Sequence, residues 1–132
     1  MKILFPLLLA AAFVSACGGP QLTPEQKAKR AESRAIVKAA QATAKTVTVN
    51  DKTFSVARVV KYNHTIVELV GEPTPYYIKD VEAASRAATG CKGKFDAGVL
   101  AFVGWDIQTI DLAFLRTKIS GDFDGWTVDL DC

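Results

Sequence analysis

The sequence has little of what defines several specialised classes of protein. No apolar run reaches the roughly 18 to 20 residues of a membrane-spanning helix, which argues against such a helix. Nine glycines and five prolines among 132 residues are too few for a collagen-like or low-complexity chain. A net charge of +2 with 49% hydrophobic residues argues against gross disorder and against a nucleic-acid partner. The length suits one domain.

Residues that commonly carry catalysis are also scarce. His64 is the only histidine, and its place in the predicted turn 62–65 favours a turn residue over a catalytic one. No G-x-S-x-G motif is present. Asp106 and Asp111 could pair as acid and base, but their spacing alone says nothing of their environment. The sequence therefore favours a protein that is not an enzyme, and we expect no cofactor.

The late aspartates begin like a calcium-binding loop. Asp122 and Asp124 precede Gly125, and Asp129 and Asp131 follow. A calcium site needs six to eight oxygen ligands, and the usual third acidic position and closing glutamate are absent. A turn followed by a solvated strand face is the favoured interpretation, and a metal site at Asp122 and Asp124 is a weak alternative.

Residues 1–16 have the pattern of an export signal. Lys2 supplies a short positive region, and the apolar stretch 3–14 is long enough for a signal-peptide core and too short to span a membrane. The tetrad Val14-Ser15-Ala16-Cys17 resembles the lipobox of bacterial lipoproteins, with a branched apolar residue, two small residues and a cysteine. We expect cleavage between Ala16 and Cys17, and a lipidated tether over residues 17–23.

The resemblance to bacterial lipoproteins covers about the first twenty residues and implies an anchor, not an activity. It implies a diacylglycerol thioether on the Cys17 thiol and a further acyl chain, such as palmitate, on the freed amine. Two or three acyl chains hold a protein firmly, whereas one binds only marginally. Gly18 in place of an aspartate favours the outer membrane, facing the periplasm, over the inner membrane. An ordinary secretory signal with a chance cysteine is the alternative.

The two other cysteines predict a disulfide. If Cys17 carries lipid, Cys91 and Cys132 remain as an even pair in an oxidising compartment. Their bridge would close a loop of about 41 residues and stabilise the fold by about 4 kcal/mol in the chain-entropy estimate. Metal binding is a poorer interpretation because no CxxC pair exists. A redox role is weaker because the two cysteines lie far apart in the sequence.

Two helices are predicted in one small α+β domain over residues 24–132. Thr23-Pro24-Glu25-Gln26 is typical of a helix start with a capping box. This Ala-rich helix should run to about Ala44. A second helix is predicted over 77–89, and Gly90 should end it in the left-handed conformation.

Period-two alternation predicts the strands of one antiparallel sheet. A hairpin is expected over 47–56 and a second strand pair over 59–70. Strands are also expected over 95–103 and 126–132, while 107–119 favours a strand over a helix. The result is a sheet of about five to six strands with the second helix between its halves and the helices on one side.

Two surfaces could contact a partner. A basic stripe on the first helix comprises Lys27, Arg30, Arg34, Lys38 and Lys45. It lies beside the expected anchor and could bind an anionic membrane face, with a binding free energy of roughly 1 kcal/mol per cation. A stripe that only faces solvent fits equally well. An adjacent stripe of small residues comprises Ala28, Ala31, Ala35, Ala39 and Ala42. Tyr76 and Tyr77 follow Pro73 and Pro75 and could form an aromatic edge for a protein or glycan, although packing at the helix entry is favoured. Trp105 and Trp126 are expected to anchor the core.

Together these features predict a lipid-anchored cell-envelope protein with a binding or structural role at the membrane surface, contacting another envelope component. The alternatives are an envelope enzyme or a calcium- or ligand-binding module. The enzyme requires a deep polar cleft that gathers several of Asp106, Asp111, Asp122, Asp124 and His64. The calcium- or ligand-binding module requires the late aspartates to converge.

Overall fold

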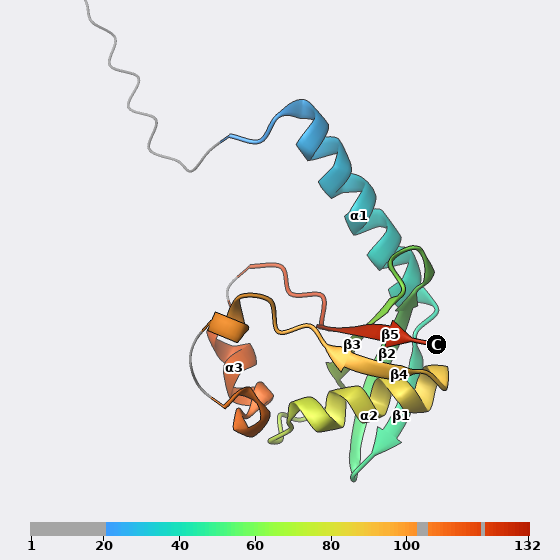
Figure 1. Ribbon diagram of the computed structural model, residues 1–132, viewed down its shortest axis with the longest axis vertical. Coiled ribbons are helices and arrows are strands. Elements are labelled where there is room, and N and C mark those ends of the chain that lie inside the picture. Colours follow the sequence, from blue (N-terminus) through green and yellow to red (C-terminus); the bar gives the residue numbers. More distant parts are fainter. Residues whose placement is uncertain (1–20, 103–105, 120) are drawn as a thin grey trace, which may run out of the picture.

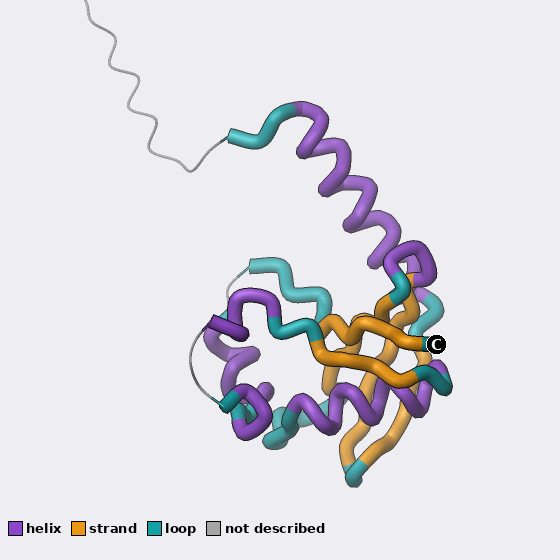
Figure 2. Tube along the Cα trace, viewed as in Figure 1, coloured by secondary structure: helices purple, strands orange, loops and turns teal. Residues whose placement is uncertain are grey.

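The computed structural model describes residues 21–102, 106–119 and 121–132, which form an α+β domain. In chain order its helices and strands are α1 (Pro24–Ala42), β1 (Lys45–Val49), β2 (Lys52–Val59), β3 (His64–Leu69), α2 (Ile78–Thr89), β4 (Lys92–Phe95), α3 (Leu112–Lys118) and β5 (Trp126–Asp131). The strands form one antiparallel five-stranded sheet in the order β1-β2-β3-β5-β4 (Figures 1 and 2). None of the helices in these ranges is long and apolar enough to cross a membrane.

The main core lies between the sheet and α2. Phe54, Val67 and Val128 from β2, β3 and β5 are fully buried beneath Val81 and Ala84 of α2. The last strand alternates as predicted, because Trp126, Val128 and Leu130 are buried while Asp129 and Asp131 are exposed. Antiparallel strands with one buried face give this alternation.

A second, smaller core lies on the opposite face of the sheet. Ala57, Val59 and Ile66 alternate with the residues that face α2, and the second half of α1 packs on them through Ile36 and Val37. The prediction that the helices share one side of the sheet is therefore wrong: α1 and α2 lie on opposite faces (Figure 1). The physical reason is that β2 carries buried apolar side chains on both faces, Phe54 and Val56 in the main core and Ala57 and Val59 in the smaller one.

Helix α1 begins as predicted, at a point away from the body of the domain (Figure 1), and only its second half packs on the sheet. Thr23 Oγ1 accepts from Gln26 N at 3.2 Å, and Gln26 Oε1 accepts from Thr23 N at 3.0 Å, which completes the capping box. No residue of α1 is buried, and its first half projects away from the sheet (Figure 1). The five alanines of the predicted small-residue stripe are all exposed.

Three strand predictions need correction. Residues 59–61 are not a new strand, because β2 continues to Val59 and a 3-10 turn follows at Val60–Tyr62. The predicted strand 95–103 ends at Phe95 and gives way to a 3-10 turn at Gly98–Phe102, while residue 103 lies outside the described residues. Residues 107–119 are helical rather than extended, with a 3-10 turn at Ile107–Thr109 and then α3.

Aspartates at two helix starts explain the last of these corrections. Asp106 accepts from Gln108 N at 3.1 Å, and Asp111 accepts from Ala113 N at 2.9 Å. Such side-chain bonds to nearby backbone N–H groups favour a helix start over a strand ladder. The spacing of the apolar residues that follow fits both a helix and a strand, so the capping aspartates decide that this segment is helical.

The predicted disulfide between Cys91 and Cys132 is present. Their Cα atoms lie 4.7 Å apart. Gly90 ends α2 with φ of 75°, the left-handed conformation expected of it, and Cys91 lies immediately before β4. The bridge therefore ties the chain that follows β5 to the end of α2.

Candidate functional site

Tyr76 lies at the entry to α2 and is almost fully buried. Its exposed fraction is 2%, its ring packs edge-on against Phe54 at 5.6 Å, and its hydroxyl accepts a hydrogen bond from Trp126 Nε1 at 2.7 Å. The idea of an exposed aromatic edge is wrong for Tyr76, and Tyr77 is half-buried. The packing role at the helix entry, which the sequence favoured, is confirmed.

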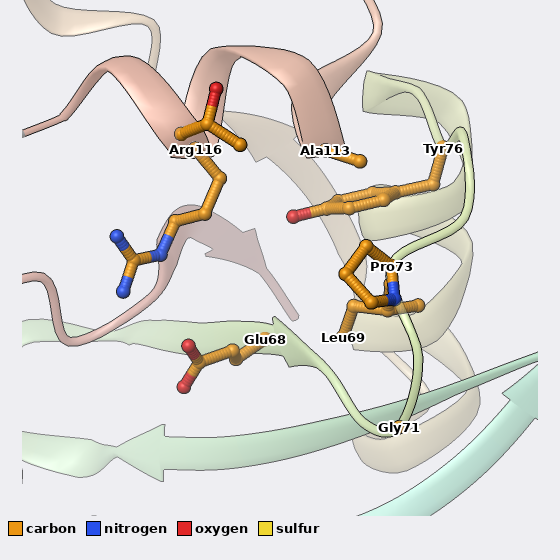
Figure 3. Close-up of a pocket in the computed structure, with 8 residues that line it drawn as sticks. Glu68, Leu69, Gly71, Pro73, Tyr76, Ala113 and Arg116 are labelled. Atoms are coloured by element: carbon orange, nitrogen blue, oxygen red, sulfur yellow. The ribbon is translucent and has the colours of Figure 1, made fainter.

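A small pocket opens beside the hydroxyl end of Tyr76. It lies between the loop that follows β3 and helix α3 (Figure 3), and its volume is about 150 Å³. A cavity of roughly this volume holds a group the size of a benzene ring. The residues that line it are mainly apolar or small, with two charged side chains: Glu68, Leu69, Gly71, Pro73, Tyr76, Ala113, Arg116 and Thr117.

Two opposite charges flank the opening of the pocket. Glu68 comes from the end of β3 and Arg116 from α3, and the Tyr76 hydroxyl points between them (Figure 3). Neither charged group has an ion-pair partner within 4.0 Å among the residues that the structure describes. The Arg116 guanidinium carbon lies 4.3 Å from the centroid of the Phe123 ring, a cation–π contact that holds the side chain in place.

The Tyr76 hydroxyl is a hydrogen-bond donor with an unused proton. Burial raises the pKa of Tyr76 above its ordinary value of 10.0, more than the hydrogen bond from Trp126 and the charge of Arg116 lower it. The hydroxyl is therefore protonated at neutral pH. Its oxygen already accepts from the indole, and the described residues offer its proton no acceptor.

Asp111 fixes the two walls of the pocket relative to each other. Its Oδ1 accepts from Tyr76 N at 3.3 Å and from Ala113 N at 2.9 Å. Leu112 N in turn donates to the Tyr76 carbonyl at 2.8 Å. Asp111, considered in the sequence as half of an acid–base pair, thus caps α3 and joins it to the loop before α2.

His64 lies apart from this pocket. It begins β3, whereas Glu68 lies near the end of that strand. Its ring stacks on Tyr62 with centroids 5.6 Å apart, and its Nε2 has no hydrogen-bond partner among the described atoms. Burial lowers the pKa of His64 below 6.5, although Asp129 and Asp96 act to raise it. The neutral ring is the favoured form here.

The acidic residues considered in the sequence do not converge. Asp106 caps a 3-10 turn, while Asp122 and Asp124 are exposed in the loop before β5. In the ranges that the structure covers, no three or more histidine, cysteine, aspartate or glutamate side chains gather closely enough to hold a metal ion. The convergence that the calcium and enzyme alternatives require is therefore not seen there.

The basic stripe of α1 faces solvent. Lys27, Arg30, Arg34 and Lys38 are all exposed. Arg34 and Lys38 border a shallow groove against the loop of Asp122 and Asp124, where Gln41 Nε2 donates to the Asp124 carbonyl at 2.9 Å. Lys45 belongs instead to β1.

Some predicted residues cannot be placed. Ala16, Cys17 and Trp105 lie outside the described residues. Trp126 is buried in the core, as expected. Sequence reasoning gave no role to Glu68 or Arg116, because nothing in their local sequence distinguishes them from solvated surface charges.

No protein-family model, curated protein or solved structure matches this chain.

Proposed function

We propose that this protein is a lipid-anchored cell-envelope protein that binds a small ligand in the pocket between the loop following β3 and helix α3. The observation that carries the proposal is the meeting of an apolar pocket with three polar groups: the Tyr76 hydroxyl and the charged ends of Glu68 and Arg116. An apolar concavity with a few convergent polar groups is the usual form of a small-molecule site.

The chemistry of the pocket favours binding over catalysis. The raised pKa of Tyr76 keeps its hydroxyl protonated, so it donates a hydrogen bond and does not serve as a base at neutral pH. His64 lies towards the other end of β3, and Asp111 is engaged by two backbone N–H groups. No observation favours an enzyme specifically.

The anchor is supported by the leader and by the placement of α1. The Val14–Cys17 tetrad resembles a lipobox, and α1 begins a few residues after it. Its 19 residues extend about 28 Å, and its first half projects from the sheet (Figure 1) up to Glu32, which pairs with Lys61 at 2.8 Å. Since α3 packs into the core on the α2 face of the sheet, opposite to the face that α1 covers, the anchored domain would present its pocket on the side away from α1. We retain the outer membrane, periplasmic face, as the proposed location.

Replacing the expected lipidation site tests the anchor. We expect Cys17→Ser to move the protein from the membrane fraction to the soluble fraction and to remove the lipid from its mass spectrum. The matched control is the Cys91→Ser/Cys132→Ser double variant, which should keep the lipid. Membrane association of Cys17→Ser that withstands salt washing would contradict the proposal.

Nuclear magnetic resonance tests the binding function. The indole N–H of Trp126 donates to the Tyr76 hydroxyl, so its resonance reports on the pocket. We expect at least one compound of a small-metabolite library to shift this resonance in the folded protein, and Ala113→Leu, which fills the pocket, to abolish that shift. A Trp126→Phe variant assigns the resonance. A library that leaves it unmoved would overturn the binding function.

A further inference from the structure

We propose that the ligand of this pocket is a small aliphatic zwitterion: a molecule with a primary ammonium, a carboxylate and one short apolar group. Free aliphatic amino acids and short peptides share this chemistry. The inference rests on the proposed binding function and specifies its ligand.

The two charges at the opening require a ligand with both signs. Glu68 and Arg116 flank the same opening, are both half-buried, and lack ion-pair partners within 4.0 Å in the described part of the chain. An anion would pair with Arg116 but meet the like charge of Glu68, and a cation would do the reverse. A neutral ligand would desolvate both charges without pairing either. A zwitterion pairs with both.

The Tyr76 hydroxyl sets the orientation of the ligand. Its oxygen already accepts from Trp126 Nε1, and its remaining proton can only be donated. A carboxylate accepts hydrogen bonds and an ammonium does not. The ligand carboxylate therefore lies between Tyr76 and Arg116, and the ammonium lies toward Glu68.

The apolar walls set the size of the third group. Leu69, Pro73, Ala113 and the Tyr76 ring surround about 150 Å³. This is well below the 300 Å³ or more of typical drug-sized pockets and suits a group no larger than a benzene ring. A branched aliphatic side chain fits this space.

A shallower hollow next to the pocket could hold a second residue of a peptide. It shares Pro73, Ala113 and Thr117 with the pocket and is bordered by Phe114, of which 61% is exposed. A single amino acid would leave this hollow empty. The two sources of the same chemistry can thus be separated by whether Phe114 contributes to affinity.

The experiment titrates the folded full-length protein with L-leucine and its two blocked forms, following the Trp126 indole resonance. N-acetyl-leucine lacks the ammonium, and leucinamide lacks the carboxylate. Charge-assisted hydrogen bonds are the stronger kind, so we expect each blocked form to bind at least about tenfold more weakly than leucine. Leucyl-glycine, compared in wild type and Phe114→Ala, separates a peptide ligand from a free amino acid.

Charge variants link each preference to one residue. Glu68→Gln should remove the preference for leucine over N-acetyl-leucine, and Arg116→Gln should remove the preference for leucine over leucinamide. Arg86→Gln and Asp131→Asn change exposed charges that do not line the pocket, and both should retain these preferences.

Equal binding of leucine and its blocked forms, or no binding of any of them, would overturn the zwitterion proposal. If library compounds of another charge type shift the Trp126 resonance while leucine does not, the zwitterion is excluded and the binding function stands. If no compound shifts the Trp126 resonance, both the zwitterion proposal and the binding function are overturned.

Discussion

Asp80 shows how one buried carboxylate joins separate parts of the chain. Only 1% of it is exposed, and it accepts from Asn50 Nδ2 at 2.8 Å, from Lys52 Nζ at 3.3 Å and from Tyr77 N at 2.9 Å. The hairpin between β1 and β2 is thereby fixed to the start of α2, immediately after Tyr76. Burial by itself raises the pKa of Asp80, but these hydrogen bonds and the Lys52 charge outweigh it and lower the pKa below 3.8.

Removing this carboxylate should destabilise the fold. We expect Asp80→Ala to lower the free energy of unfolding by about 2–4 kcal/mol at pH 7, because it leaves buried donors without an acceptor. Since the folded pKa is lowered, the contribution of Asp80 is complete above the unfolded value of about 3.9 and is lost as pH falls through the folded value. Urea unfolding at pH 7 and pH 3 checks both, with Asp131→Ala as the exposed control. Equal losses in the two variants would contradict this role.

Gly125 occupies a position that no other residue fits. Its φ is +131°, and a Cβ there would lie 2.6 Å from Ile66 Cγ2 and 2.9 Å from the Val67 carbonyl oxygen. Gly125→Ala should therefore cost about 2–4 kcal/mol, from backbone strain plus overpacking beside the core. Gly121→Ala is the matched control, because its φ is +86° but no atom lies within 4 Å of the added Cβ. Thermal unfolding should show the larger loss at Gly125; the reverse order would exclude the steric argument.

At the scale of elements, α1 consists of two halves with different roles. Ile36, Val37, Ala40 and Ala44, in and just after the second half, pack on the sheet, while residues 24–32 are exposed. Helix stability in proteins comes mainly from packing of an apolar face, so the first half depends on its capping box, its intrinsic propensity and two exposed ion pairs, Glu25–Lys29 and Glu32–Lys61. It is the less stable part of the helix.

A proline substitution in each half of α1 tests whether the two halves contribute differently to the stability of the fold. Ala31→Pro should reduce helical circular dichroism yet change the global unfolding midpoint little, because the residues that it disrupts contribute little to the core. Val37→Pro should lower the midpoint strongly, and Val37→Ala serves to separate lost packing from lost helix. A large drop in the Ala31→Pro midpoint would show that the first half is packed after all.

The elements set by local chemistry were those that the sequence predicted well. The Thr23–Gln26 capping box, the Gly90 stop and the alternation over 126–131 each determine structure within a few residues. Residues 107–119 were not predictable in this way, because their apolar residues fit both periods and the caps at Asp106 and Asp111 decided between them. The sequence did not predict that β2 packs on both faces, because this depends on which face of the sheet α1 covers.

At the scale of the whole molecule, the candidate site exists only after folding. Glu68, Tyr76 and Arg116 come from β3, a loop and α3, and tertiary packing alone brings them together. The sequence raised a surface role for Tyr76 but favoured packing at the helix entry, and the structure buries its ring with the hydroxyl beside the pocket. Charged residues whose role depends on neighbours that are distant in the sequence cannot be recognised from local sequence patterns.

The disulfide supports the whole domain rather than one element. It closes a 41-residue separation that includes β4, α3 and β5. We expect the Cys91→Ala/Cys132→Ala variant to lose about 4 kcal/mol of unfolding free energy, chiefly because the unfolded chain gains freedom. Guanidinium unfolding of oxidised and reduced wild type should reproduce the difference seen between wild type and the variant. A loss below about 1 kcal/mol would mean that the unfolded state is already compact.

The order of the strands has a consequence for biosynthesis. The last strand in the chain, β5, lies between β3 and β4 and supplies Trp126, Val128 and Leu130 to the interior. Until those residues emerge from the ribosome, β4 has no neighbour to pair with and β3 has one side open. A nascent chain consequently stays incomplete through most of its synthesis. For the export that we propose, this delay would leave time for passage through a translocation pore in an unfolded form.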